Sequence, residues 1–219
     1  IRWNRQGQWV SPAEFIPLAE SAGLIVDLGD WILQTACEKA QRLVAEGNDE
    51  LVIAVNISPM QFGRPDFLEK VKQVLNQTHL PAKNLELEIT EGVIIYNEQE
   101  TIAALEALKE LGVKLAIDDF GTGYSSLSYL KKFNIDKLKI DQSFIRQLQS
   151  DEADQSIVRT IIELGRNLQL SLIAEGVEAL EQQAILQAMG CDEIQGYYFS
   201  RPLPEQKFIE FIRSYKTST

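Results

Sequence analysis

The sequence is poor in the residues that most catalytic and metal-binding sites use. Its 219 residues include one histidine, His79, and two cysteines, Cys37 and Cys191. A single histidine excludes Ser-His-Asp and Cys-His arrangements, the HExxH zinc motif and every metal site built from several histidines. Two cysteines are too few for a disulfide scaffold or a cysteine-based zinc site, so we expect a cytoplasmic protein. Any catalysis must use carboxylates, amides, lysine or a metal held by oxygen ligands.

Long apolar runs and an excess of positive charge are also absent. No run approaches the ~20 apolar residues of a membrane-spanning helix, so we expect no membrane segment in this chain. The 21 Lys and Arg residues face 32 Asp and Glu residues, which gives a net charge of −11. This balance disfavours binding to duplex nucleic acid. A small anionic ligand can still bind where local cations outweigh the overall negative field.

Strand and helix patterns alternate along most of the chain. A helix is predicted from Ser11-Pro12, with Glu14 in a capping box and Gly23 as its stop, and another over Trp31–Leu43. Strands are then predicted over Leu51–Val55, Leu85–Ile89, Lys114–Ile117, Lys137–Ile140, Ser171–Ala174 and Glu193–Tyr198. Helices are predicted between them over Asp66–Leu75, Gln99–Leu111, Ala153–Leu168 and Leu180–Met189. This order predicts parallel strands with crossover helices, as a barrel or an open sheet, within one domain covering residues 1–219.

Polar residues stand at the ends of these otherwise apolar strands. They are Asn56, Glu88, Asp118, Asp119, Lys139, Asp141, Glu175 and Gln195. In a (β/α)₈ barrel the C-terminal ends of the strands converge on one active-site mouth, so all of these side chains would point into one space.

Carboxylates gathered in one mouth need a compensating cation. Like charges ~4 Å apart repel by about 1 kcal/mol in water and by several at an effective dielectric near 20. Oxygen donors, including the amide oxygen of Asn56, suit Mg²⁺ or Mn²⁺. The adjacent carboxylates of Asp118 and Asp119 can serve two ions, and Lys139 can orient water or offset charge on a phosphate.

Each residue also has a structural explanation when it is taken alone. Asp118-Asp119 fits a turn or a helix cap, and Glu175 before Gly176 fits a cap of the next helix. Lys139 fits a side chain that extends to solvent from an exposed strand. Taken together, these structural explanations are less convincing than one shared site, because each of the six strand ends would need its own separate explanation.

Several long motifs in the same order resemble the EAL-domain phosphodiesterases, which hydrolyse the bacterial messenger cyclic di-GMP. The resemblance covers nearly the whole chain. The matching stretches are Ser11–Glu20, Val55–Ser58, Glu88–Glu91, Asp118–Ser126, Leu138–Asp141, Ala174–Glu178, Gln195–Tyr197 and Ser200–Leu203.

The resemblance implies a fold, a metal site and a ligand. The fold is α/β, a modified TIM-type (β/α)₈ barrel with an antiparallel first strand. The implied metal ligands are Asn56, Glu88, Asp118, Asp119 and Glu175, and the implied catalytic residues are Lys139, Glu175 and Asp119. Arg2, Asp141 and Gln195 match substrate-binding residues. Glu91 matches the acid that anchors the loop Asp119–Ser126, which the family couples to metal binding and to dimerisation.

One family feature lies outside the sequence. The Glu-Ala-Leu signature, whose glutamate is a metal ligand, precedes an Arg-Trp pair, and this chain begins at Ile1-Arg2-Trp3. Asn4-Arg5 also replaces a common His-Pro pair. We expect the signature to lie immediately upstream, in a longer protein with sensory or cyclase domains.

The resulting hypothesis is a phosphodiesterase that uses two Mg²⁺ or Mn²⁺ ions to open cyclic di-GMP to the linear dinucleotide, and that forms a homodimer. The alternative is a receptor that binds cyclic di-GMP without cutting it; the complete set of ligands within the chain favours the enzyme. A third alternative is an unrelated Mg²⁺ barrel acting on carbanions with Lys139 as its base, in which Glu88–Glu91 and Asp118–Gly123 would have no role.

Overall fold

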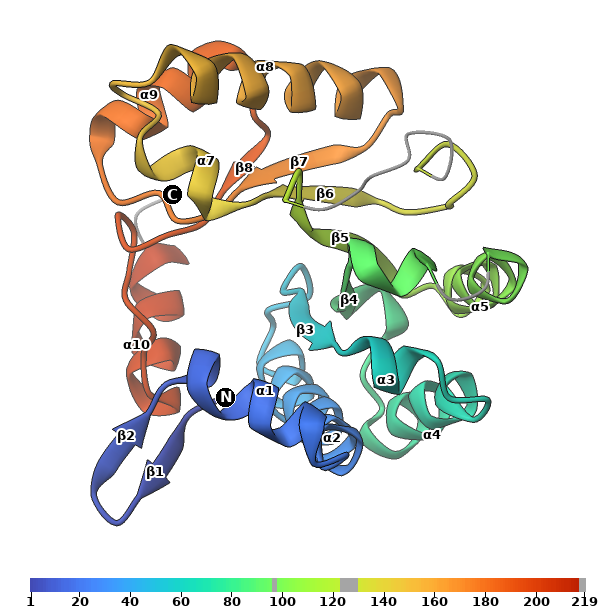
Figure 1. Cartoon of the computed structure of the whole chain (residues 1–219). Coiled ribbons are helices and arrows are strands. Elements are labelled where there is room, and N and C mark those ends of the chain that lie inside the picture. Colours follow the sequence, from blue (N-terminus) through green and yellow to red (C-terminus); the bar gives the residue numbers. More distant parts are fainter. Residues whose placement is uncertain (96–97, 123–129, 217–219) are drawn as a thin grey trace. The chain divides into compact units, whose positions relative to one another are not determined.

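The computed structural model of the chain describes residues 1–95, 98–122 and 130–216. The chain forms two compact units, Ile1–Lys139 and Ile140–Thr219, so the division falls inside strand β6 (Lys137–Ile140). In Figure 1 the first unit runs from blue to yellow and the second from yellow to red. We describe each unit by itself.

The first unit begins with a hairpin. Strands β1 (Trp3–Arg5) and β2 (Gln8–Val10) pair antiparallel across Gln6 and Gly7, whose φ angles of 52° and 91° are those of a two-residue hairpin turn. Helix α1 (Pro12–Ser21) follows, with Pro12 at its first position as predicted. The predicted cap is wrong in one respect, because the Ser11 side chain makes no capping hydrogen bond.

Helix α2 (Ile25–Ala45) begins six residues before the predicted start at Trp31. Its buried side chains include Ile25, Leu33 and Cys37, so the apolar face extends through Gly29. A Cβ atom at Gly29 would lie 2.1 Å from Oε1 of Gln61, which explains why this helix carries a glycine at that point. The helix packs on β3 and α4.

The sheet of the first unit has the strand order β3 (Ile53–Ile57), β4 (Leu85–Thr90), β5 (Lys114–Phe120) and β6. The pairs β3–β4 and β4–β5 are parallel, as predicted. Three predicted strands stop too early: β3 includes Asn56, β4 includes Thr90, and β5 includes Asp118-Asp119. They continue because backbone pairing extends to the polar residues, with Asn56 opposite Glu88 and Asp118 opposite Thr90.

Short and long helices connect these strands. They are α3 (Pro59–Phe62), α4 (Phe67–Thr78), η1 (Ala82–Asn84), η2 (Glu91–Ile95) and α5 (Glu98–Glu110). Gly112 has φ 89° just after α5, a left-handed conformation that commonly ends a helix at a glycine. His79 is exposed at the end of α4 in a left-handed conformation with φ 59°, consistent with a surface position.

The second unit contains α7 (Gln142–Arg146), α8 (Glu152–Asn167), β7 (Ser171–Ala174), α9 (Leu180–Met189), β8 (Glu193–Ile194) and α10 (Glu205–Lys216). Strand β7 pairs in parallel with β8. The predicted strand Glu193–Tyr198 is wrong beyond Ile194, because the chain there passes against Val177. A Cβ atom at Gly196 would lie 2.0 Å from the carbonyl oxygen of Val177.

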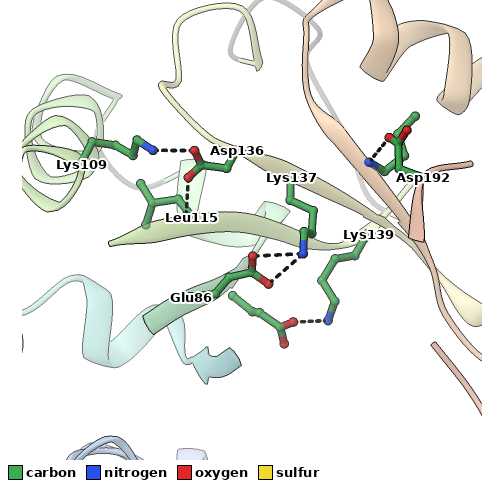
Figure 2. A network of polar contacts seen from close by, with 9 residues as sticks. Glu86, Lys109, Leu115, Asp136, Lys137, Lys139 and Asp192 are labelled. Atoms are coloured by element: carbon green, nitrogen blue, oxygen red, sulfur yellow. Dashed lines mark hydrogen bonds and ion pairs between the residues drawn. The ribbon is translucent and has the colours of Figure 1, made fainter. Parts of the chain in front are cut away.

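An aspartate immediately before a strand contacts the start of an earlier strand in both units. In the first, Asp136 precedes β6 and its Oδ2 accepts a hydrogen bond from the Leu115 amide at 2.8 Å. In the second, Asp192 precedes β8 and its Oδ2 accepts from the Leu172 amide at 2.9 Å. Figure 2 shows the contact between Asp136 and Leu115. These bonds fix the offset between strands.

Within the described ranges, no helix is both long enough and apolar enough to cross a membrane. The longest, α2, has 21 residues but carries charged side chains at Asp27, Asp30, Glu38, Lys39 and Arg42.

Candidate functional site

Three oxygen-bearing side chains share one face of the sheet in the first unit. Asn56 of β3 is the register partner of Glu88 of β4, and Asp118 of β5 is the partner of Thr90. Side chains alternate between faces along a strand, and register partners in a parallel pair share a face. Asn56, Glu88 and Asp118 therefore point to the same side, as the strand-end pattern predicted.

Lys139 of β6 joins two of these carboxylates. Its Nζ lies 2.8 Å from Oε1 of Glu88 and 2.9 Å from Oδ1 of Asp118. All three residues are buried, with 3%, 6% and 8% of Lys139, Glu88 and Asp118 exposed. Buried charges are tolerated where they are paired, and one ammonium here serves two carboxylates. The explanation of Lys139 as an exposed-strand lysine is therefore wrong.

Asp119 directly follows Asp118 in the sequence, but its environment differs from that of the buried Asp118. Its side chain is exposed, and its backbone is left-handed with φ 54°, a conformation that aspartate adopts more readily than most residues. Its N–H donates to Oδ1 of Asp118 at 3.0 Å, and its carbonyl accepts from the Thr122 hydroxyl at 2.8 Å. The turn thus directs two consecutive carboxylates into different surroundings.

Glu91 holds the segment after this turn. Its Oε1 accepts a hydrogen bond from the Gly121 amide at 3.0 Å. This contact has the form expected for a loop anchor, and the functional role of Glu91 stays a prediction. Residues 123–126 of the predicted loop lie outside the described residues.

Three predicted site residues of the second unit each follow the last residue of a strand. Asp141 follows β6 and caps α7, because its Oδ1 accepts from the Ser143 amide at 2.9 Å. Glu175 follows β7 and its N–H donates to the Ile140 carbonyl at 3.1 Å. Gln195 follows β8 and its N–H donates to the Ala174 carbonyl at 2.8 Å. The predicted strand ends before Asp141 and Glu175 agree with the structure, whereas Gln195 was expected inside a strand and instead directly follows β8.

Arg2 is the remaining predicted residue. It lies in the exposed segment before β1, and its Nη1 donates to the Ile1 carbonyl at 2.7 Å. Its proposed contact with substrate stays a prediction.

Sequence reasoning missed a second ion pair beside the first, between a buried glutamate and a partly buried lysine. Lys137 of β6 contacts Glu86 of β4, with Nζ–Oε2 and Nζ–Oε1 distances of 3.2 and 3.5 Å. Figure 2 shows Lys137 reaching Glu86 and the neighbouring Lys139 side chain extending from the same strand. The available signal was spacing, since each of these residues stands two positions before a predicted site residue, in Glu86-Leu87-Glu88 and Lys137-Leu138-Lys139.

The two cysteines are free thiols with raised pKa values. Burial raises the pKa of the Cys37 thiol to about 12 and that of Cys191 to about 11. A thiolate is the reactive form of cysteine, so both thiols are unreactive at neutral pH.

The donor chemistry of the site fits a hard divalent cation. Asn56, Glu88 and Asp118 offer one amide oxygen and two carboxylates on a single face, next to the exposed carboxylate of Asp119. Mg²⁺ and Mn²⁺ prefer such oxygen donors, whereas zinc and copper sites generally use nitrogen and sulfur. The described residues also supply one buried ammonium, which can orient a polar group or neutralise an anion.

Comparison with known families identifies the chain. The family model described as "EAL domain" matches residues 1–202, so the chain belongs to the EAL domain family. Solved EAL-domain structures have a TIM-barrel-like fold, so the predicted α/β fold class is confirmed.

Individual relatives resemble the chain over nearly its whole length. It is 44% identical over 217 residues to the cyclic di-GMP phosphodiesterase NbdA of Pseudomonas aeruginosa, covering 99% of this chain and 28% of that protein. It is 36% identical over 216 residues to the cyclic di-GMP phosphodiesterase PdeR of Escherichia coli, covering 98% of this chain and 32% of that protein. The chain thus spans about a third or less of these relatives.

A solved structure described as a PaMucR phosphodiesterase in complex with c-di-GMP is also similar. The TM-score is 0.91 at 41% sequence identity, covering 94% of this chain and 84% of that one.

Proposed function

We propose that this chain is a metal-dependent phosphodiesterase domain that hydrolyses cyclic di-GMP to the linear dinucleotide. The observation that carries the proposal is the buried group of Glu88, Asp118 and Lys139, with Asn56 on the same face. Relatives over 99% and 98% of the chain are named cyclic di-GMP phosphodiesterases, which supports the substrate.

EAL phosphodiesterases in general depend on a metal ion. Asn56, Glu88, Asp118 and Asp119 would hold the metal here, and we assign Glu175 to the same donor set from its motif. When bound, Mg²⁺ or Mn²⁺ supplies Lewis acidity for activating water and for neutralising charge on a phosphoryl oxygen. We propose two ions because Asp118 and Asp119 offer adjacent carboxylates.

The other proposed roles in the site are the positioning of carboxylates and the binding of ligand. The Lys139 ammonium holds Glu88 and Asp118 in place and offers an N–H donor for a water or for a phosphate oxygen. Glu91 keeps Gly121 next to the Asp118-Asp119 turn. Arg2, Asp141 and Gln195 would contact the ligand. Since the chain carries a net charge of −11, a dianionic ligand needs the local positive charge of Arg2, Lys139 and the bound metal.

The wider setting belongs to the same proposal. We expect a homodimer in the cytoplasm and further domains upstream. The P. aeruginosa relative named bifunctional diguanylate cyclase/cyclic di-GMP phosphodiesterase MucR, of which the chain covers 31%, supports the upstream domains. Both cysteines are free thiols, as in a reducing compartment. Sedimentation of the purified protein with and without ligand tests the dimer.

The direct test is hydrolysis of cyclic di-GMP followed by chromatography of the products. The protein should yield the linear dinucleotide with Mg²⁺ or Mn²⁺, and EDTA should stop the reaction. Asp118→Asn should lower kcat by at least about a hundredfold, because it removes a charged ligand. Asp66→Asn is the matched control: Asp66 pairs with Arg64 on the surface, so its loss should leave turnover unchanged. Binding of cyclic di-GMP without product would instead identify a receptor.

A further inference from the structure

A second ion pair lies beneath the candidate site. Glu86 is 4% exposed, and the side chain of Lys137 is 15% exposed. Glu86 precedes Glu88 by two residues and Lys137 precedes Lys139 by two residues, so each pair projects from the same face of its strand. The spacing of two residues along a strand is ~6.7 Å. The two ion pairs therefore form successive layers.

Both layers pass over an intervening strand. In the sheet order β4-β5-β6, the glutamates come from β4 and the lysines from β6. Ala116 of β5 is the register partner of Glu88, is fully buried and presents a single methyl group on the face that the charges share. Its small volume leaves room for the long side chains of the Lys139 layer to meet above β5; the β5 residue beside Glu86 is Lys114.

The upper layer carries an excess of negative charge, whereas the lower layer sets the Glu86 carboxylate beside Lys137 and beside Lys114, the β5 register partner of Glu86. Above, Lys139 faces the two carboxylates of Glu88 and Asp118. Below, Lys137 faces Glu86. Charges in a buried environment act over this separation with little screening by salt, so the lower layer contributes to the potential at Glu88.

We propose that the Glu86–Lys137 ion pair is a charge-balancing layer that sets the divalent-cation affinity of the site without touching metal or substrate. This inference rests on the proposed function, which makes Glu88 and Asp118 cation ligands. Removing the Glu86 carboxylate takes one negative charge from beneath the site and makes the site more positive. Removing Lys137 has the opposite effect.

The sign of the effect separates this role from a structural one. Each single substitution breaks the Glu86–Lys137 ion pair, so both should destabilise the fold. In calorimetric titrations with MnCl₂, Glu86→Gln should weaken Mn²⁺ binding by about tenfold, whereas Lys137→Met should strengthen it or leave it unchanged. The double variant Glu86→Gln/Lys137→Met should return to the wild-type affinity, because the net charge is restored. A purely structural role would shift both single variants in the same direction.

The outcomes distinguish this inference from the proposed function. Wild-type protein that neither binds Mn²⁺ nor hydrolyses cyclic di-GMP would overturn the proposed function. Wild-type protein that does both, with single variants that shift together or not at all, would overturn the charge-balancing layer alone. If a single variant does not fold, the double variant and Lys137→Arg still decide the matter. Both preserve the charge balance, and a tenfold loss of Mn²⁺ affinity in either one contradicts the proposal.

Discussion

Replacing Lys139 by methionine tests the central contact of the site. The substitution keeps an unbranched apolar side chain and removes the ammonium that lies 2.8 Å from Glu88 and 2.9 Å from Asp118. Without it, the two carboxylates face each other uncompensated, and like charges at roughly 5 Å repel by ~3 kcal/mol at an effective dielectric of 20. Loss of one partner from a buried ion pair typically costs about 3–5 kcal/mol, and we expect a destabilisation of that size.

The assay is urea unfolding of wild-type and Lys139→Met protein, first in EDTA and then in millimolar Mg²⁺. The destabilisation should appear in EDTA and shrink in Mg²⁺, because a bound divalent cation neutralises the same two carboxylates. We also expect kcat with cyclic di-GMP to fall by at least about a hundredfold even in saturating Mg²⁺. Lys70→Met is the control: Lys70 pairs with Asp30 at 3.3 Å on the surface, where loss of a pair costs about 0–1 kcal/mol.

Two results would refute this reasoning. Wild-type stability of Lys139→Met in EDTA would mean that the carboxylates do not depend on the ammonium. An unchanged kcat in a variant that is destabilised would mean that Lys139 serves the fold and not the reaction.

Three further predictions concern a glycine, a thiol and the loop contact. Gly196→Ala should destabilise the protein by about 1–3 kcal/mol in urea unfolding, because the new methyl group would lie 2.0 Å from the Val177 carbonyl oxygen. Burial raises the pKa of the Cys37 thiol to about 12, above its unfolded value of ~8.5, so the folded state binds this proton more tightly. Its contribution to stability should be constant below pH ~8.5 and fall by up to ~1.4 kcal/mol per pH unit as the pH rises towards 12, measured as the difference from Cys37→Ala. Glu91→Ala should lower kcat by about tenfold or more in the hydrolysis assay, because the Gly121 amide loses its acceptor.

Each of these has a matched control. Gly92→Ala should be tolerated, because the nearest atom to its new Cβ lies 3.8 Å away, and equal losses at both glycines would contradict the argument. A pH dependence identical in wild-type and Cys37→Ala protein would show that the thiol does not titrate as described. Glu91→Gln retains an acceptor oxygen and should keep most of the activity; equal losses in both variants would mean that the hydrogen bond is not what matters.

The strands that carry the site could be predicted from the sequence because they are short apolar runs that end in polar residues. Lys137–Ile140 and Ser171–Ala174 have the predicted bounds. The wrong strand ends came from a general rule that fails at these site residues. Asn56 and Asp118 were placed after their strands because polar residues usually end a strand, whereas here they are paired within it.

The contacts between strands could not be predicted from local pattern. Nothing in the sequence near Lys139 specifies that its ammonium meets both Glu88 and Asp118, since that depends on the order β4-β5-β6. Glu86 and Lys137 were missed for the same reason: each is unremarkable in its own strand, and their pairing becomes visible only in three dimensions. The early start of α2 also depends on a contact distant in the sequence, because the Gln61 side chain fills the space beside Gly29.

The aspartates that precede β6 and β8 have a consequence for the opposite ends of the strands they contact. Asp136 holds the Leu115 amide and Asp192 holds the Leu172 amide, and in each case a candidate metal ligand, Asp118 or Glu175, follows three residues later. A shift of one residue would turn either carboxylate to the wrong side of its strand. The hydrogen bond at the start of each strand therefore positions the candidate ligand that follows its other end. We expect a substitution of Asp136 or Asp192 to lower activity, although the bond that it removes lies at the opposite end of the strand from the candidate ligand.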